Sequence, residues 1–389
     1  MILWESYIGG GQSLGVVGEG ATLALDALGE EVRIRAWNAS RILRRTFFPN
    51  EVRAALAGYL WEEQWLESLN PRVQPMVVAG SGKIDVDTER ESVGVMWGWI
   101  KRLESFYWRH AKVAAGYVFY DYTALARNDV RLCNAMDVMF VPSTFCKEAL
   151  VSSGVSVPVV VWSHGVDCKL FKPGVGRGGS GPFRFLFVGV AQPRKGLDEL
   201  LQAFVRAFPE NITDVELIVK SSDWGELRPW KQEYGADPRI VWLHETYDRV
   251  RLSLLFQEVD CLVVPSRAEA FCLPALEAMA CGLPVVFTNH GGHLDFCDQV
   301  VGYPVAVTVE PTMRPVLAKL NDYVDTPLWA TADVENLALV LRHVYEHPVE
   351  AKAKGAQARV RAERWSWEAG SREALMVLRS MCPGVMRGA

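Results

Sequence analysis

Short strand-like runs alternate with helix-like runs along most of the chain. The apolar runs of strand length lie at 1–5, 31–37, 116–120, 138–141, 159–162, 183–188, 216–220, 240–243, 261–264 and 283–288. Helix-like runs such as 16–28 and 197–208 stand between them, and the second has its apolar residues on one helical stripe. Strands that are separated by helices predict an α/β fold with parallel sheets. Ligands of such folds bind beyond the carboxyl ends of the strands, so we looked for functional side chains there.

The length of 389 residues is enough for two domains of ordinary size. The best candidate for a linker is the glycine-rich segment 172–182, because such a sequence does not hold regular structure cheaply. We therefore expect one α/β domain over 1–172 and a second over 173–365. The remaining segment, 366–389, contains a helical run with its apolar residues on one stripe, which predicts a C-terminal helix.

The segment 267–286 carries two carboxylates, Glu269 and Glu277, eight positions apart. Pro274 lies between them and suits the start of a helix, while Gly282 suits its end. Glu269 is therefore expected on a loop and Glu277 in the first turns of the following helix. The free N–H groups of a helix start favour a phosphate, whereas carboxylates favour hydroxyl donors such as those of a ribose. Together these features indicate a site for a nucleoside diphosphate bearing a sugar.

The spacing Glu-x7-Glu followed by Ala-Met-Ala-x-Gly-x-Pro-Val-Val resembles the donor-binding segment of family 4 glycosyltransferases. These are retaining enzymes of the GT-B fold, in which two Rossmann-like domains face each other across a cleft. The resemblance implies that 1–172 is the acceptor-side domain, that 173–365 binds the nucleotide-sugar donor, and that the last helix crosses back to the first domain. Cys272 stands where the family commonly has glycine. The donor-binding residues that the resemblance implies in this segment are Glu269, Ala270, Phe271, Cys272, Leu273 and Glu277.

A second loop, 189–196, follows the strand-like run 183–188 and precedes a helix. It contains Arg194 and Lys195, and two cations before a helix N-terminus make a site for an anion. The loop resembles the phosphate loop of the family, and Lys195 matches the lysine of that motif. Val190 stands where the family often has arginine, so we expect Arg194 to supply that charge. The alternative is a solvated Arg-Lys turn.

Glycines at 9–11 follow the first strand-like run and would allow close approach of the backbone to a phosphate or sugar. Their spacing does not fit Gly-x-Gly-x-x-Gly, and Trp37-Asn38 stands where an acid should end the second strand, so an NAD enzyme is disfavoured. The family has a similar loop near the donor diphosphate. We therefore place Gly10 and Gly11 among the expected donor-binding residues.

Asp121 follows the strand-like run 116–120. In related enzymes this end of the first domain faces the transferred sugar, so Asp121 could bind a sugar hydroxyl or steady positive charge at the anomeric carbon. The alternative is a carboxylate that caps the next turn. With Glu269 and Lys195, Asp121 completes the set of residues expected to be catalytic.

We expect no metal ion and no other cofactor. Asp85-Val-Asp87 is a short motif that occurs often by chance, and it lies far in sequence from the donor loops. His290 and His293 could pair as ligands, but no third ligand is evident, and they are interpreted as turn or sugar-contact residues. None of the eight cysteines forms a Cys-x2-Cys pair, so a zinc site is not indicated.

The composition bears on whether the protein binds nucleic acid or a membrane. The net charge of −5 gives no support to a general binder of the phosphate backbone of nucleic acid. Segment 97–112 is aromatic and basic, and it reads either as a buried helix with a charged outer face or as a contact surface for lipid or nucleic acid. The sequence contains no run of 18 apolar residues, so we expect no membrane-spanning helix. We expect a cytoplasmic protein, with peripheral contact to a membrane left open.

The sequence thus predicts a retaining, metal-independent glycosyltransferase that moves a sugar from a nucleotide sugar, UDP- or GDP-linked, to an unidentified acceptor. Glycan, lipid, small-molecule and modified-DNA acceptors all remain open. Two alternative functions stand beside this hypothesis. One is an enzyme that glycosylates a base in modified DNA, and the other is a non-catalytic subunit that binds sugar nucleotides.

Overall fold

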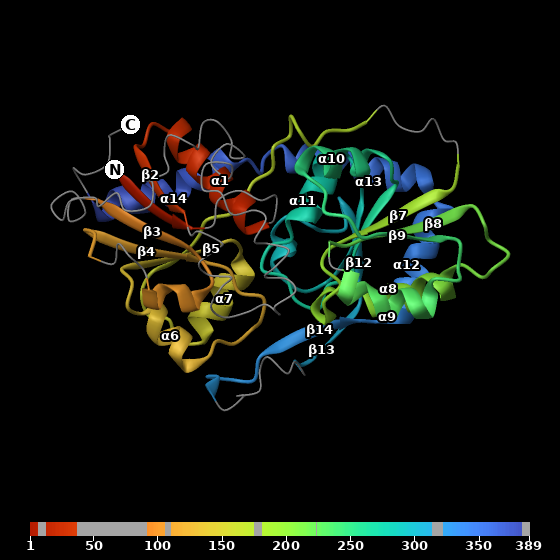
Figure 1. The fold of residues 1–389 in the computed structure, drawn as a ribbon, viewed down its shortest axis with the longest axis horizontal. Helices are drawn as coiled ribbons and strands as arrows, with labels where there is room; N and C mark the ends of the chain where they lie inside the picture. The colour runs from red at the N-terminus through yellow and green to blue at the C-terminus, as the bar shows by residue number, and fades with distance from the viewer. Residues whose placement is uncertain are drawn as a thin grey trace.

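The computed structural model describes residues 1–6, 13–36, 92–105, 110–174, 181–222, 224–312 and 322–382. Four residues considered above, Gly10, Gly11, Asp85 and Asp87, lie outside the described residues. Two parallel sheets form the centres of two domains, which lie side by side in Figure 1. The expected α/β class is confirmed.

The first sheet is entirely parallel and belongs to the first domain. Its strands, in spatial order, are β2 (Val32–Ala36), β1 (Ile2–Ser6), β3 (Val93–Gly98), β4 (Val113–Val118), β5 (Val138–Val141) and β6 (Val159–Val161). Aromatic rings fill its core, as Tyr117 stacks on Trp162 at 4.8 Å between ring centroids and Trp4 packs edge-on against both. The inner strands β3, β4 and β5 are continuous apolar runs, as expected where both faces of a sheet are covered.

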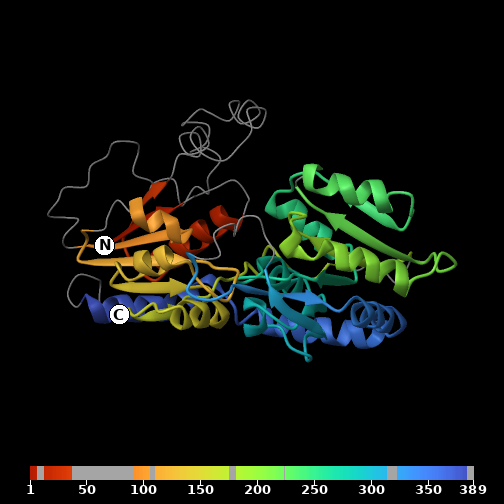
Figure 2. The same ribbon diagram turned by 90° about the horizontal axis from the view of Figure 1, so that it is seen from below.

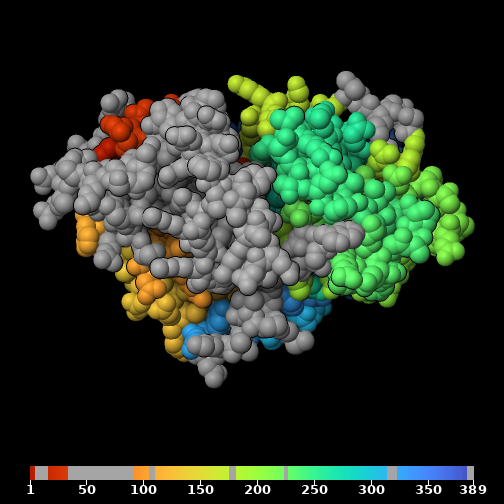
Figure 3. Space-filling view, viewed as in Figure 1, coloured from red at the N-terminus to blue at the C-terminus, as the bar shows by residue number. Residues whose placement is uncertain are grey.

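The second sheet is also parallel. Its strands, in spatial order, are β12 (Gly302–Val305), β11 (Val285–Thr288), β10 (Cys261–Val264), β7 (Phe183–Val188), β8 (Val215–Lys220) and β9 (Ile240–Leu243). In the space-filling view the second domain, largely green, occupies the right-hand side, and residues of the first domain, orange and yellow, lie to the left (Figure 3). The expected linker 172–182 joins β6 to β7, and only part of it is described.

The helices cover the faces of both sheets. In the first domain they are α1 (Ser13–Ala27), the 3₁₀ helix η3 (Ile100–Ser105), α6 (Arg127–Cys133) and α7 (Thr144–Ser152). In the second they are η4 (Pro193–Lys195), α8 (Leu197–Ala207), α9 (Trp224–Tyr234), α10 (Arg249–Gln257), α11 (Leu273–Ala280), η5 (Gly292–Asp295), α12 (Val334–Glu346) and α13 (Pro348–Ala362). Among the described residues, no helix is both long enough and apolar enough to span a membrane.

The last helix, α14 (Trp367–Met381), returns to the first domain and packs against α1, as Figure 1 shows at the left. The contact is close enough to require glycine at position 20. A Cβ atom there would lie 2.5 Å from the ring of Trp367. Arg379 of α14 also pairs with the buried carboxylate of Glu30 at 2.9 Å. We retain the division into 1–172, 173–365 and 366–389 as a proposal.

A two-stranded antiparallel hairpin of the second domain extends toward the first domain. It consists of β13 (Val307–Pro311) and β14 (Leu328–Ala332), and it lies beneath both domains in Figure 1 and crosses the middle of Figure 2. The segment before β14 reaches the first domain, where Leu328 N–H donates to Thr123 Oγ1 at 2.9 Å and Tyr323 bridges Ala126. The sequence patterns did not predict this hairpin.

Segment 97–112 differs from its expected form. Trp97 and Gly98 end β3, a short 3₁₀ helix follows, and residues 106–109 lie outside the described part of the chain. Of the two readings left open, a single buried helix over the segment is therefore wrong, and the contact surface stays a prediction. Trp97 is buried because it belongs to an inner strand of a sheet that is covered on both faces.

Candidate functional site

The candidate site forms where loops from three parallel strands meet at their carboxyl ends. Loop 189–196 follows β7 and ends in η4, loop 265–272 follows β10 and leads into α11, and Asp121 follows β4 of the first sheet. The carboxyl ends of parallel strands are the usual place for a ligand in an α/β fold. The structure therefore brings the two donor loops predicted from the sequence to the same edge of one sheet.

Glu269 is the centre of this cluster, and its side chain is buried. Lys195 Nζ donates to its Oε1 at 2.5 Å, and Ser266 Oγ donates to the same oxygen at 2.8 Å. Arg194 Nη1 lies 3.7 Å from the other oxygen, Oε2. Burial alone would raise the pKa of Glu269, but Lys195 and Arg194 outweigh it and lower that pKa to about 2. Glu269 is thus a fixed anion in contact with both cations of the other donor loop.

Asp121 contacts the donor loop from the first domain. Its Oδ1 accepts the N–H of Ala270 at 3.0 Å and lies 3.7 Å from Arg194 Nη1. Arg194 therefore stands between two carboxylates, one from each domain, and it also donates to the carbonyl of Ala268 at 3.2 Å. The sequence-based alternative in which Asp121 caps its own next turn is not what these contacts show, because its acceptor contact crosses to the second domain.

Ala270 is held by the first domain on its carbonyl side as well. Ser143, the N-cap of α7, donates from Oγ to the carbonyl of Ala270 at 2.6 Å. Asp295 provides a further contact between the domains, because its carboxylate accepts the N–H of Thr144 at 2.8 Å. The two domains therefore meet directly at the loop that carries Glu269.

Glu277 lies in α11 with a buried side chain, as expected for the helix that follows the loop. Its partner is Arg249, the first residue of α10, whose Nη1 donates to Glu277 Oε1 at 2.5 Å. The guanidinium of Arg249 also lies over the ring of Phe171, at 4.7 Å from its centroid. Sequence reasoning missed Arg249, because its separation from Glu277 in the chain belongs to no local motif.

The backbone conformation of Cys272 accounts for the glycine that the family commonly has at this position. It is the N-cap of α11, with φ at 73° and ψ at 69°, and no other non-glycine residue among those described has a positive φ. Glycine adopts this left-handed conformation readily, whereas other residues are strained in it. Its thiol is buried, and burial raises its pKa. Phe271 beside it packs against Phe296 and Trp365, so its side chain fixes the loop rather than pointing to solvent.

The two histidines of the sequence analysis do not form a ligand pair. His293 is buried and its Nε2 bonds the carbonyl of Thr288 at 2.8 Å, while His290 packs edge-on against Phe145. No group of three or more histidine, cysteine or acidic side chains that could hold a metal ion occurs within the described ranges.

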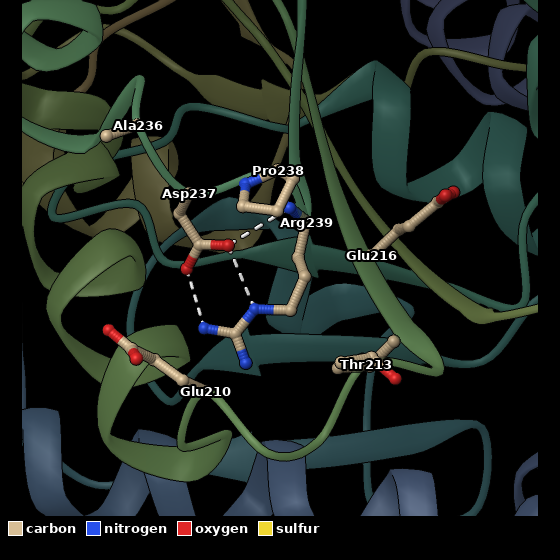
Figure 4. A pocket seen from close by; sticks show the side chains of 8 residues that line it. Glu210, Thr213, Glu216, Ala236, Asp237, Pro238 and Arg239 are labelled. Atoms are coloured by element: carbon tan, nitrogen blue, oxygen red, sulfur yellow. Dashed lines mark hydrogen bonds and ion pairs between the residues drawn. The ribbon is translucent and has the colours of Figure 1, made fainter.

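A cavity of about 500 Å³ lies at the opposite edge of the second sheet (Figure 4). It is lined by residues that precede β8 and β9, among them Glu210, Thr213, Asp237 and Arg239. Arg239 makes a fork with Asp237 and donates to the carbonyls of Phe208, Pro209 and Ile212. These contacts occupy its guanidinium, so we assign Arg239 a structural role and propose no ligand for this cavity.

Comparison with known proteins relates the chain to glycosyltransferases. Residues 155–313 match the family model of glycosyl transferases group 1. An MMP alpha-(1->4)-mannosyltransferase of Mycolicibacterium hassiacum is 27% identical over 78% of this chain and 64% of its own length. A D-inositol 3-phosphate glycosyltransferase of Mycolicibacterium paratuberculosis is 30% identical over 52% of this chain and 43% of its own length. The chain thus spans less than two thirds of the length of these curated relatives.

Solved structures match almost the entire chain. Sucrose-phosphate synthase from Thermosynechococcus elongatus aligns with a TM-score of 0.65 and 19% identity, over 98% of both chains. The Anabaena protein HepE in complex with UDP aligns with a TM-score of 0.61 and 17% identity, over 97% of this chain and 99% of its own. These solved structures show that the chain has the GT-B fold, and residues 155–313 are similar to the group 1 glycosyl transferases.

Proposed function

We propose that the chain is a retaining, metal-independent glycosyltransferase that transfers a sugar from a nucleoside-diphosphate sugar to an acceptor. The observation that carries this proposal is the cluster of Lys195, Arg194 and Glu269 at the carboxyl edge of the second sheet. It lies within the two loops that the family motif predicts, and the loops belong to the segment that matches the family. The chemistry of the cluster fits departure of a diphosphate, as follows.

Lys195 and Arg194 are the groups that would stabilise the departing diphosphate. Both are held close to the N-terminal ends of helices, and both are partly buried, where a cation stabilises developing negative charge more strongly than in water. The first N–H groups of α11, near Cys272 and Leu273, would add further donors. Two cations and a helix N-terminus supply the charge that a metal ion supplies in other transferases, which is why no metal is proposed.

The two glutamates have separate roles in the proposal. Glu277 would accept hydrogen bonds from ribose hydroxyls, and Arg249 would hold its carboxylate in place. Glu269 would accept from a hydroxyl of the transferred sugar, while Lys195 and Ser266 orient it. The low pKa of Glu269 keeps it ionised at every pH of interest, so it serves as an acceptor and not as a general acid.

Asp121 would approach the sugar from the first domain, because it already contacts the donor loop at Ala270. A carboxylate there could accept a sugar hydroxyl or stabilise positive charge at the anomeric carbon as the diphosphate departs. We propose attack by the acceptor on the same face, with retention of configuration and no covalent bond to the protein. Gly10 and Gly11 remain proposed donor contacts on the basis of the sequence alone.

The donor is proposed to be UDP- or GDP-linked. This rests on relatives that are named as mannosyltransferases and on structural neighbours in complex with UDP, one of them also with glucose. The acceptor stays open. Contact with a membrane surface and a cytoplasmic location stay open in the same way.

The test is to incubate the protein with UDP-glucose and with GDP-mannose, each together with candidate glycan, lipid and small-molecule acceptors, in excess EDTA, and to measure release of the nucleoside diphosphate and the glycoside formed. We expect release from at least one donor that EDTA does not change, and a product whose anomeric configuration by NMR equals that of the donor. An inverted product would overturn the retaining mechanism. Loss of release on chelation that manganese restores would overturn metal independence and return attention to Asp85 and Asp87.

A further inference from the structure

The helix that follows the phosphate loop begins with two acids. Asp198 and Glu199 lie in the first turn of α8, directly after Lys195 and Gly196. Acidic residues stabilise a helix N-terminus, but here they stand beside the loop proposed to bind a diphosphate. Left uncompensated, two carboxylates at this place would repel the donor and cancel the charge of Lys195 and Arg194.

Arg267 compensates them. Its Nη2 donates to Asp198 Oδ2 at 2.5 Å and also to Glu199 Oε1, and its side chain is only 9% exposed. Burial and the neighbouring Asp198 raise the pKa of Glu199, so the pair favours sharing a proton over carrying two full charges. Trp329 of β14 covers the guanidinium at 5.2 Å from the centre of its ring.

Arg267 also fixes the backbone of both donor loops. Its Nη1 donates to the carbonyl of Pro193, and its own N–H donates to the carbonyl of Arg194 at 2.8 Å. The carbonyl of Arg267 accepts from Ala330 of β14 at 2.9 Å. The loops touch so closely that a Cβ atom on Gly196 would lie 1.9 Å from the carbonyl oxygen of Pro265. One residue thus connects η4, the first turn of α8, the loop of Glu269 and the hairpin.

We propose that Arg267 is a positioning residue for the donor diphosphate, which neutralises Asp198 and Glu199 and holds the loop of Lys195 against the loop of Glu269. The inference rests on the proposed function, since it assigns a role within the same donor site. Arg267 need not touch the ligand. Its effect is to keep the phosphate loop net cationic and in register with Glu269.

The test is to measure the dissociation constants of UDP and GDP by calorimetry for the parent and for two variants. One variant lacks the cation of the cluster and the other lacks its two acids. R267Q removes the guanidinium and leaves the acids, so we expect nucleoside diphosphate binding to weaken on the order of 10- to 100-fold. D198N/E199Q removes the acids and leaves the guanidinium, so we expect binding as tight as in the parent or tighter. A merely structural role of this cluster would weaken binding in both variants, and that result overturns the proposal.

The matched control is R239Q. Arg239 is a second buried arginine of the same domain that holds an aspartate and several carbonyls, but it lies at the opposite edge of the sheet (Figure 4). We expect R239Q to lower the melting temperature and to leave the dissociation constants unchanged. Weakening by R239Q equal to that by R267Q would overturn the proposal, because it would show that any loosening of the domain weakens binding.

Restoration gives the decisive comparison if R267Q folds poorly. R267Q/D198N/E199Q lacks both the cation and the acids, and we expect its binding of nucleoside diphosphate to return to within about threefold of the parent. Binding by this triple variant that stays about 10-fold or more weaker than that of the parent would contradict the neutralising role. Failure of the parent itself to bind UDP or GDP would count against the proposed function, whereas parent-like binding by R267Q would count only against this inference.

Discussion

At the scale of single residues, Lys195 carries the largest part of the proposed chemistry. It lies between β7 and α8, its Nζ is held by Glu269 at 2.5 Å, and its side chain is mostly buried. A cation in this setting is already oriented before the donor binds, so it stabilises a leaving diphosphate without reorganising.

Replacing Lys195 with alanine should lower the turnover number on the order of 100-fold or more, because a charge that stabilises the transition state is removed. Steady-state release of the nucleoside diphosphate measures this. K354A is the matched control, since Lys354 is a comparably exposed lysine that pairs with Glu350 on α13. Turnover by K195A close to that of K354A would remove Lys195 from the site.

His164 makes the stability of the protein sensitive to acid. Both of its ring nitrogens are buried without a hydrogen-bond partner in the part of the chain that the structure describes, among the rings of Trp97, Phe271 and Trp367. Burial lowers its pKa from 6.5 to about 3. Between these values the unfolded chain binds a proton that the folded chain does not. Stability is therefore full above about pH 6.5 and falls as the pH drops toward 3.

H164F should flatten this acid sensitivity, because phenylalanine keeps the aromatic packing and removes the titrating group. Melting temperatures measured from pH 7.5 down to pH 4.5 should fall less steeply for the variant than for the parent. The difference should correspond to about one proton fewer taken up on unfolding. Parallel curves for parent and variant would show that His164 is not the group that takes up the proton on unfolding.

The sequence located the loops that carry Lys195, Arg194 and Glu269, because each lies in a short motif whose strand and helix follow from local patterns. It could not predict Arg249, the partner of Glu277, or Arg267, the partner of Asp198 and Glu199. Arg249 and Arg267 act through contacts that join distant parts of the chain, and no spacing within a single segment signals them. Asp121 was expected to face the sugar, and its contact with the N–H of Ala270 depends on how the two domains meet.

At the scale of elements, the start of α11 is the place where local sequence and structure conflict. Cys272 takes a left-handed backbone conformation, which costs a non-glycine residue about 1–2 kcal/mol. The conformation turns the chain from the loop of Glu269 into the helix of Glu277. The strain is therefore stored at the join between two proposed donor-binding elements.

C272G should be more stable than C272A by about 1 kcal/mol, the reverse of the usual order of alanine over glycine. Both variants remove the thiol, so their difference reports the backbone conformation alone. Calorimetric melting of the two proteins under one condition measures it. A higher melting temperature for C272A would mean that position 272 does not hold a positive φ in solution.

The bounds of several strands followed closely from the sequence, because their apolar runs are short and clearly delimited. The bounds expected for 138–141, 183–188, 240–243 and 261–264 are those of β5, β7, β9 and β10. Segment 97–112 and the hairpin of β13 and β14 were not anticipated. The first begins as a central strand with an aromatic end, and the second pairs across a long connection, so neither leaves a clear local period.

At the scale of the whole molecule, the crossing to α14 ties the two domains. The chain leaves α13 of the second domain, and the backbone of Trp367 then passes close to Gly165, which follows β6 of the first domain. A Cβ atom on Gly165 would lie 2.1 Å from the Trp367 nitrogen. Trp162 Nε1 donates to Ser371 Oγ at 3.2 Å within the same contact. Any motion of one domain relative to the other would therefore bend the chain here.

Deleting residues 366–389 should therefore weaken the domain pairing and abolish sugar transfer, while nucleoside diphosphate binding by the second domain survives in part. Transfer and calorimetric binding are measured on the same preparation, and circular dichroism checks that the second domain is folded. G165A should give a milder form of the same defect, because the added methyl group meets backbone atoms. Transfer by the truncated protein at the parental rate would show that α14 does not tie the domains.

A crystal structure of the chain with UDP or GDP tests the central claim most directly. The account predicts the diphosphate within hydrogen-bond distance of Lys195 and Arg194, the ribose hydroxyls at Glu277, and the nucleotide at the carboxyl ends of β7 and β10. A nucleotide bound in the cavity beside Arg239, at the opposite edge of the second sheet, or bound without contact to Lys195 and Glu277, would contradict it.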